Sequence, residues 1–297
     1  MVKFEHILFP VDFSPQVDAT VPYVASLARK FSAKVTLLSV VPPIWAGRGP
    51  KPDYADELEI STKKRLAGAL TAEVHGLTVE RAVVSGEPAE GILAYAKARA
   101  VDLIMMPTHG YGVFRSLLIG SVTAKVLHDA PCAVWTAAHT AEQRVEQRAE
   151  QRAEQRAEHR ARQVPEKIIC SVDGGPNSVA QMRWAAEFSA RLGARLLVLH
   201  AVPSVADWSA LLGDREIQEE ELSSARKRIE AQCLAAGLAE PPYVAVGPIS
   251  EIVAAQVVAE RADLLIIGRG QAGAAFGRLR THAYDIIRSS QCPVLSV

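Results

Sequence analysis

The sequence lacks an excess of charge of either sign. Lysine and arginine together number 33, and aspartate and glutamate together number 33, so the formal net charge is +0 and the pI is near 7.1. Proteins that bind nucleic acid or an anionic membrane usually present a basic surface, because the partner is a dense array of phosphates. The composition gives no support to either kind of partner, and we expect neither.

Cysteine is scarce, and the cysteines do not cluster. Cys132, Cys170, Cys233 and Cys292 stand in apolar runs or helices, without a CxxC motif or a Cys/His cluster. This pattern is typical of buried, reduced thiols in a cytosolic protein. The opening residues, MVKFEHILFPVDF, contain no long apolar signal segment, and no apolar run approaches the length that crosses a bilayer. We therefore expect a soluble, cytoplasmic protein.

The sequence does contain a regular alternation of apolar strands and helices. With 297 residues, the chain is long enough for two domains that each bury a core. Strict alternation predicts a parallel sheet with helices on both faces and right-handed crossovers. In the first half, the predicted strands are 6–11, 34–41, 79–84, 103–106 and 132–135, and the predicted helices begin after Ser14, run over 55–75, follow Pro88 to Ala100, and start at Gly120.

The order of elements begins again after Pro165. Landmark residues recur at one offset of 161 residues, among them Asp12 and Asp173, and Asp102 and Asp263. Cys132 and Cys292 are instead 160 apart, so the copies differ by one residue between their fourth and fifth strands. The chain is therefore an internal duplication. The second copy has predicted strands at 167–172, 195–202, 243–246, 264–267 and 292–297, and its long helical region up to Ala236 is predicted to break near Gly213.

A low-complexity segment separates the copies. From Ala141 it reads AEQRVEQRAEQRAEQRAEHRARQ, a four-residue repeat. These residue types favour a helix, but the repeat has no apolar stripe and stacks like charges at i,i+4. It cannot join a core. We predict domains over 1–138 and 166–297 and a solvated, partly helical spacer over 139–165.

A glycine-bearing loop lies between the fourth and fifth strands of the first copy. Gly110 is followed after nine residues by Gly120 and Ser121, which open a helix that should carry Val122, Ala124, Val126 and Leu127 inward. The amino end of a helix presents unpaired N–H groups and favours an anion. Phosphate is the expected occupant, although glycines before a helix also serve ordinary turns.

The second copy differs in this loop. Arg280-Thr281 stands in the place of Gly120-Ser121, whereas Gly268 stands where the first copy has Pro107. An arginine obstructs close approach of the backbone to a phosphate, so the second loop is degenerate. Proline has a fixed φ and no N–H, so Pro107 disfavours close approach of the backbone to a phosphate at that point of the first loop.

These motifs together resemble those of the universal stress protein family. The resemblance rests on ILFPVDFS and IICSVDGG, on LLSVVP and VLHAVP, and on the loop of the first copy, and it covers both copies but not the spacer. It implies two tandem doubly wound α/β sheets of strand order 3-2-1-4-5, of the adenine nucleotide α-hydrolase-like type. Such sheets bind ligands at the carboxyl ends of the strands where the strand order reverses.

The resemblance also implies a ligand and the residues that hold it. In the ATP-binding branch of the family, the Asp that ends the first strand lies by the ribose and adenine, a Val that ends the second contacts adenine, and the loop holds the phosphates. Carried to this sequence, the cofactor is ATP, with Mg²⁺ as a candidate companion, and no catalytic or metal-binding residue is assigned. The cofactor-binding residues are Asp12, Val40, Gly110, Gly120, Ser121 and Val122.

Each assignment has a structural alternative. Asp12 can cap its own loop, Val40 can be a core residue, and Ser121 can be only a helix cap. His109 beside Gly110 is an ordinary loop histidine unless a carboxylate accompanies it.

Three functional classes compete. The first is an ATP-binding stress-response module with little or no catalysis, slow hydrolysis being the one activity left open. The second is a nucleotide-free interaction scaffold, which Pro107 and the degenerate second loop favour. The third, an α-hydrolase-type enzyme, needs an SGGxDS-like loop that neither PVDFSP nor SVDGGPNS supplies. No complete P-loop, metal-ligand cluster or Ser/His/Asp motif is identifiable, so we expect no enzyme.

The final strands raise the question of assembly. In the family these strands often pair across a two-fold axis, and a tandem chain can satisfy that pairing internally around Val134 and Val294. We expect a pseudo-dimer of the two domains, with further homodimerisation open.

Overall fold

The computed structural model describes residues 2–43, 52–110, 119–138, 164–203, 215–269 and 281–297. The charged spacer, the predicted break near Gly213, the middle of the glycine loop and Arg280 lie outside these residues. The described chain divides into two compact units, whose continuous parts are Lys3–Ala137 and Pro165–Val297.

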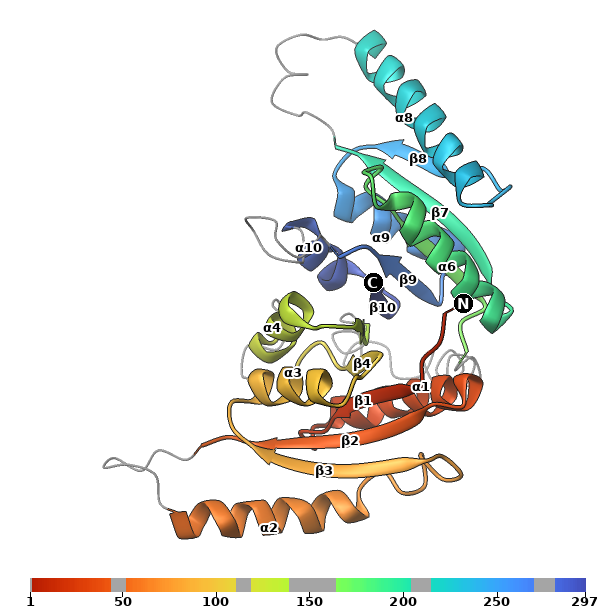
Figure 1. Cartoon of the computed structure of the whole chain (residues 1–297). Helices are drawn as coiled ribbons and strands as arrows, with labels where there is room; N and C mark the ends of the chain where they lie inside the picture. Colours follow the sequence, from red (N-terminus) through yellow and green to blue (C-terminus); the bar gives the residue numbers. More distant parts are fainter. Residues whose placement is uncertain (1, 44–51, 111–118, 139–163, 204–214, 270–280) are drawn as a thin grey trace, which may run out of the picture. The chain divides into compact units, whose positions relative to one another are not determined.

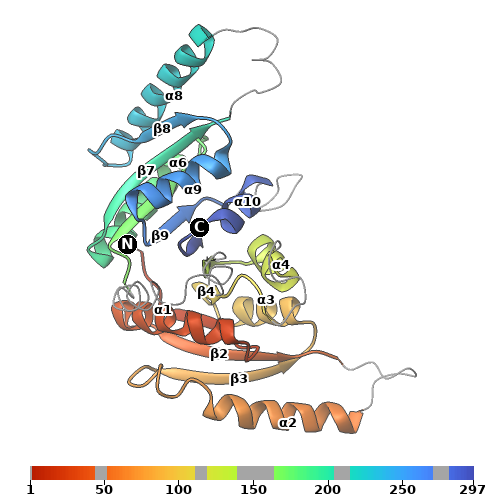
Figure 2. The same ribbon diagram turned by 180° about the vertical axis from the view of Figure 1, so that it is seen from behind.

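Among the described residues, the first unit contains a five-stranded sheet with four helices, and Figures 1 and 2 show their arrangement from two sides. Its elements are β1 (His6–Pro10), α1 (Pro15–Phe31), β2 (Lys34–Val41), α2 (Pro52–Gly68), β3 (Val79–Ser85), α3 (Pro88–Ala98), β4 (Leu103–Met106), α4 (Ser121–Asp129) and β5 (Ala133–Thr136). The strands are parallel in the order β3-β2-β1-β4-β5.

The second unit repeats this plan. Its elements are β6 (Lys167–Ser171), α6 (Ser178–Leu192), β7 (Arg195–Val202), α8 (Arg215–Ala235), β8 (Tyr243–Val246), α9 (Ile249–Glu260), β9 (Leu264–Ile267), α10 (Thr281–Ser289) and β10 (Val294–Ser296). The parallel order is β8-β7-β6-β9-β10, which is again 3-2-1-4-5 within the unit. The predicted pair of doubly wound sheets is confirmed.

The strands form the core of each unit because helices cover both faces of the sheet. With right-handed crossovers, α1 and α2 lie on one face of the first sheet and α3 and α4 on the other, and α3 packs on α4. All four residues of β4, LIMM, are buried, and so are all four of β9, LLII. None of the helices in the described ranges is both long and apolar enough to cross a membrane.

The repeated aspartates before the fourth strands tie two strands together. Asp102 accepts hydrogen bonds through Oδ2 from the backbone N–H groups of Glu5 and His6, at 2.8 and 2.9 Å. Asp263 makes the equivalent pair of bonds at the start of β6, at 3.0 and 2.9 Å. This landmark of the duplication therefore has a structural role, far from the carboxyl ends of the strands.

The first helix follows its sequence pattern except at its cap. Its predicted inward face is buried and consists of Val17, Val21, Val24, Leu27 and Ala28. Ser14 occupies the N-cap position, but its side chain makes no capping hydrogen bond. Its backbone N–H instead donates to Asp12 Oδ1 at 2.9 Å.

The second helix is shorter than the predicted range 55–75. It begins at Pro52 and ends at Gly68, and the residues up to Gly76 form turns. Gly68 is a poor helix former, and Leu70 follows with a φ of 54°. Arg81 from β3 donates to the carbonyl oxygens of Leu66 and Ala69 at 2.9 and 3.2 Å. The carbonyl groups at the end of the helix therefore have hydrogen-bond partners without a further helical turn.

The other corrections are small. The fifth strands begin at Ala133 and Val294, after the cysteines rather than at them, and β1 ends at Pro10. In α4, Val126 and Leu127 are buried as predicted, but Val122 and Ala124 are only half-buried, and the buried residue of the first turn is Thr123.

Candidate functional site

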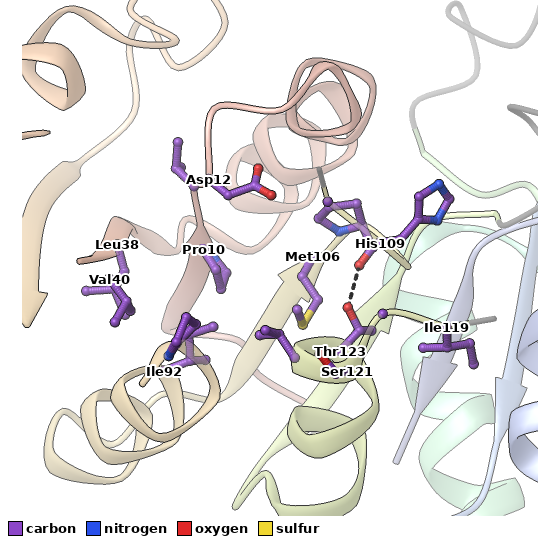
Figure 3. Close-up of a pocket in the computed structure, with 16 residues that line it drawn as sticks. Pro10, Asp12, Leu38, Val40, Ile92, Met106, His109, Ile119, Ser121 and Thr123 are labelled. Atoms are coloured by element: carbon purple, nitrogen blue, oxygen red, sulfur yellow. Dashed lines mark hydrogen bonds between the residues drawn. The ribbon is translucent and has the colours of Figure 1, made fainter. Parts of the chain in front are cut away.

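A cavity lies where the strand order of the first sheet reverses. β1 pairs with β2 on one side and with β4 on the other, so the connections that leave β1 and β4 diverge and open a crevice at their carboxyl ends. The cavity has a volume of about 560 Å³ (Figure 3). Its lining comprises Pro10, Val11, Asp12, Leu38, Val40, Pro88, Ile92, Met106, Pro107, His109, Gly110, Ile119, Gly120, Ser121, Val122 and Thr123.

Asp12 lies just after the end of β1, and one of its carboxylate oxygens is bonded within the protein. Oδ1 accepts the Ser14 N–H at 2.9 Å, which closes an Asx turn around Phe13. Oδ2 lies against Gly110, where an added Cβ would overlap it. In Figure 3 the carboxylate of Asp12 is turned toward the loop that carries His109. The absence of a side chain at residue 110 therefore allows the Asp12 carboxylate its place at the cavity.

The amino end of α4 forms the opposite wall. The Gly120 N–H donates to the Thr108 carbonyl at 2.9 Å, and the Gly120 carbonyl accepts the Ala124 N–H at 2.8 Å. Within the described chain, no acceptor partners the N–H groups of Ser121, Val122 and Thr123. Such unpaired amides are the anion-binding element of a helix start.

Gly120, which lines the cavity, also has a packing role. Its N–H is bonded to Thr108, and an added Cβ would lie 3.3 Å from the His109 Cα and 3.4 Å from the Thr108 carbonyl oxygen. The glycine thus lets the helix start pack closely on the preceding loop. The Thr123 hydroxyl reinforces this packing by donating to the Pro107 carbonyl at 3.1 Å, the dashed line in Figure 3. The amides that remain available to a ligand therefore begin at Ser121, one residue after Gly120.

The third wall is apolar. Leu38 and Val40 come from β2, and Ile92 comes from the first turns of α3 (Figure 3). Gly91 lies directly behind Val40, since an added Cβ at residue 91 would lie 2.9 Å from Val40 Cγ1 and 3.2 Å from Cγ2. This wall offers a flat aromatic group only dispersion and hydrophobic contact, whereas the opposite wall offers hydrogen bonds.

Charge is sparse around the cavity. Among its described lining residues, Asp12 and His109 are the only titratable side chains, and neither lysine nor arginine is present. His109 is buried, and its Nδ1 shares a hydrogen bond of 3.2 Å with the Thr108 hydroxyl. Within the described lining, an anion would therefore meet backbone N–H groups rather than cationic side chains.

All six residues assigned from the sequence line this one cavity: Asp12, Val40, Gly110, Gly120, Ser121 and Val122. Sequence reasoning missed Thr123 and the apolar residues Pro10, Val11, Leu38, Pro88, Ile92, Met106 and Ile119. Their position next to the carboxyl ends of β1, β2, β3 and β4 was a usable signal, because parallel strands bring these ends to one edge of the sheet.

In the second copy, Gly268 leaves room for the side chain of Gln181. An added Cβ would lie 2.5 Å from Oε1 of Gln181, whose Nε2 donates to the Ser171 carbonyl at 2.9 Å. In the first copy, the position of Gln181 is held by Thr20, which bonds to its own helix at the Gln16 carbonyl. At the positions of Gly268 and Gln181, the first copy has Pro107 and the shorter side chain of Thr20.

The comparisons with known proteins agree with this architecture. The model of the universal stress protein family matches residues 3–138 and 165–297. A universal stress protein of Thermus aquaticus is 32% identical over 139 residues, which cover 44% of this chain and 96% of the relative. One from Mycolicibacterium smegmatis is 25% identical over 229 residues, covering 72% of this chain and 69% of the relative.

A solved structure extends the likeness to the fold of the whole chain. The crystal structure of a universal stress protein from Archaeoglobus fulgidus superposes with a TM-score of 0.68 at 16% identity, covering 98% of this chain and 97% of that one. With the family model matched once in each half, the chain belongs to the universal stress protein family as a tandem member.

Proposed function

We propose that the first half of the chain binds an adenine nucleotide, ATP, in the cavity in front of Asp12, and acts as a regulatory module with little or no catalysis. One observation carries the proposal: an apolar wall, a carboxylate, and three helix-start amides that have no acceptor among the described residues meet at one cavity of about 560 Å³. A purine, a ribose and a phosphate chain require these three chemistries in turn.

The residues fit the parts of the nucleotide individually. The apolar wall around Val40 would hold the base, and the Asp12 carboxylate can accept hydrogen bonds from ribose hydroxyls. The amides of Ser121 and Val122 would face the phosphates. Because Asp12 is the one carboxylate of the described lining, an accompanying Mg²⁺ would be held mainly by the phosphates.

A nucleotide-free scaffold is the second candidate, and a specific observation favours it. The described lining contains no lysine or arginine, so the charge of a triphosphate has no cationic side chain to meet there. The two candidates differ in a directly measurable property, which is whether the chain retains a nucleotide through purification.

The experiment compares Asp12→Ala with Asp173→Ala, the same change at the duplicated position. Each protein is purified without added nucleotide and denatured, and the released nucleotides are identified by chromatography and mass; ATP titrations follow. We expect wild type and Asp173→Ala to carry or take up ATP at about one site per chain, and Asp12→Ala to lose it. Absence of binding to wild type at millimolar ATP would reject the nucleotide proposal and leave the scaffold, and equal binding by Asp12→Ala and Asp173→Ala would reject the site.

A further inference from the structure

The residue after Asp12 adopts a backbone conformation that its side chain disfavours. Phe13 has a φ of 62°, in the left-handed region where residues with a Cβ are uncommon. The Asx turn imposes this conformation, because the Ser14 N–H reaches Asp12 Oδ1 at 2.9 Å over Phe13. If Phe13 relaxed to a negative φ, this hydrogen bond would break and the Asp12 carboxylate would lose its anchor.

The duplicated turn shows what an unstrained version looks like. Asp173 Oδ1 accepts the Gly175 N–H at 2.8 Å, and the residue between them is Gly174, with a φ of 73°. Glycine adopts this conformation without steric cost. The first copy makes the same turn with a phenylalanine, so a contact of the Phe13 ring is needed to offset the cost of its left-handed backbone conformation.

That contribution comes from α2. The guanidinium carbon of Arg65 lies 4.1 Å from the centroid of the Phe13 ring, a cation–π contact. The neighbouring Leu66 is 1% exposed, and its carbonyl accepts the Arg81 Nε hydrogen bond at 2.9 Å. The backbone from which Arg65 extends is therefore fixed to β3, and the exposed Arg65 side chain reaches from it to the ring.

The second copy supports its turn from the equivalent helix by other means. Arg228 Nη2 lies 3.3 Å from where a Cβ on Gly174 would be, and Gln232 Nε2 donates to the Gly174 carbonyl at 3.1 Å. In both copies, an arginine from the second crossover helix lies against the residue that follows the strand-end aspartate. The arrangement recurs although the ring is present only once.

We propose that Arg65 is a positioning residue for Asp12: its contact with the Phe13 ring holds the Asx turn closed and keeps the carboxylate directed at the cavity. The part of this inference that concerns ligand affinity rests on the proposed nucleotide binding. Because coupling is reciprocal, a nucleotide bound at Asp12 also strengthens the contact between the turn and α2, and α2 then reports occupancy of the site.

The test uses Arg65→Met, which removes the charge, and Arg65→Lys, which keeps it. Arg99→Met is the matched control, because the Arg99 guanidinium lies 5.6 Å from the Tyr95 ring, outside the cavity lining. Two quantities are measured on the full chain: the Kd for ATP, and the hydrogen-exchange rate of the Ser14 amide in nucleotide-free protein by NMR. Unfolding temperatures are recorded in parallel.

We expect Arg65→Met to weaken ATP binding about two- to fivefold, the change that loss of an exposed cation–π contact gives, and to speed exchange of the Ser14 amide. Arg65→Lys should restore part of both, and Arg99→Met should change neither. Wild-type values for both quantities in Arg65→Met would overturn the inference, as would equal losses in Arg65→Met and Arg99→Met. If wild type binds no ATP, the proposed function fails, and exchange at Ser14 alone then decides the positioning role.

Discussion

Replacement of Gly110 by alanine should move the Asp12 carboxylate without altering the backbone preference. Gly110 does not have a left-handed φ, so alanine is compatible with its conformation. The new Cβ would, however, overlap Asp12 Oδ2 and lie 3.3 Å from Cγ. The carboxylate must therefore rotate away, and in doing so it gives up the hydrogen bond from the Ser14 N–H at 2.9 Å.

The size of the effect follows from the bonds that are lost. A hydrogen bond to a charged group contributes about 1.5–3 kcal/mol, and each 1.4 kcal/mol is roughly a factor of ten in affinity. If the carboxylate bonds to the ribose, Gly110→Ala should weaken ATP binding by about ten- to hundredfold, measured by titration calorimetry.

A control separates this effect from the general cost of a new methyl group. Gly68, at the end of α2, has nothing within 4 Å of an added Cβ, so Gly68→Ala should keep wild-type affinity and gain slightly in unfolding temperature. Wild-type affinity in Gly110→Ala would refute the reasoning, because it would mean that the ligand does not need the carboxylate in this position.

Three further predictions concern other parts of the first and second units. In Gly91→Ala, the new Cβ at 2.9 Å from Val40 Cγ1 should push that side chain into the cavity, so the affinity for ATP in calorimetric titrations should fall several-fold more than in Gly68→Ala. Burial raises the pKa of Cys170 and of Cys292 to about 12, whereas the thiols of the unfolded chain ionise near pH 8.5. The free energy of unfolding should therefore fall as the pH rises above about 8.5, by up to ~1.4 kcal/mol per thiol and pH unit. Denaturant curves at pH 8 and 10 should show a smaller fall in the double variant Cys170→Ser/Cys292→Ser, and an equal fall would contradict the assignment. A hydrogen bond from Lys34, at the start of β2, is the main cause that lowers the pKa of Glu80. The ionised Glu80 therefore stabilises the fold above pH 4.5, and this contribution disappears as the pH falls through the folded-state pKa. The stability of Glu80→Gln should fall slightly less steeply than that of wild type below pH 4.5 in acid-unfolding curves, and identical curves would contradict this.

The sequence was sufficient for the topology of both units because its signals were periodic and repeated. Short apolar runs such as LIMM at 103–106 are buried strands in the structure. The offset between Asp102 and Asp263 reflects one hydrogen-bonding arrangement used twice. The end of α2 was predicted wrongly because it depends on Arg81, a residue of the following strand, whose hydrogen bonds cannot be inferred from helix propensity.

The sequence pointed to the polar residues of the site and, of its apolar wall, only to Val40. Asp12 follows a predicted strand and Ser121 begins a predicted helix, so these polar residues are easily recognised next to apolar runs in the sequence. Ile92 and Met106 look like ordinary core residues in the sequence, and they line a cavity only because of how α3 and β4 meet in three dimensions. The bond between the Gly120 N–H and Thr108 also depends on loop geometry, which the spacing of glycines does not specify.

The most direct test of the account is an ATP titration of the full chain, followed residue by residue through backbone amide NMR signals. The account predicts that the signals of Ser121, Val122 and Thr123 shift saturably with one common Kd, that Asp12→Ala weakens this response, and that the signals of α10 in the second unit stay in place. Unmoved signals at 121–123 in the presence of saturating ATP, or a response in α10 instead, would contradict it.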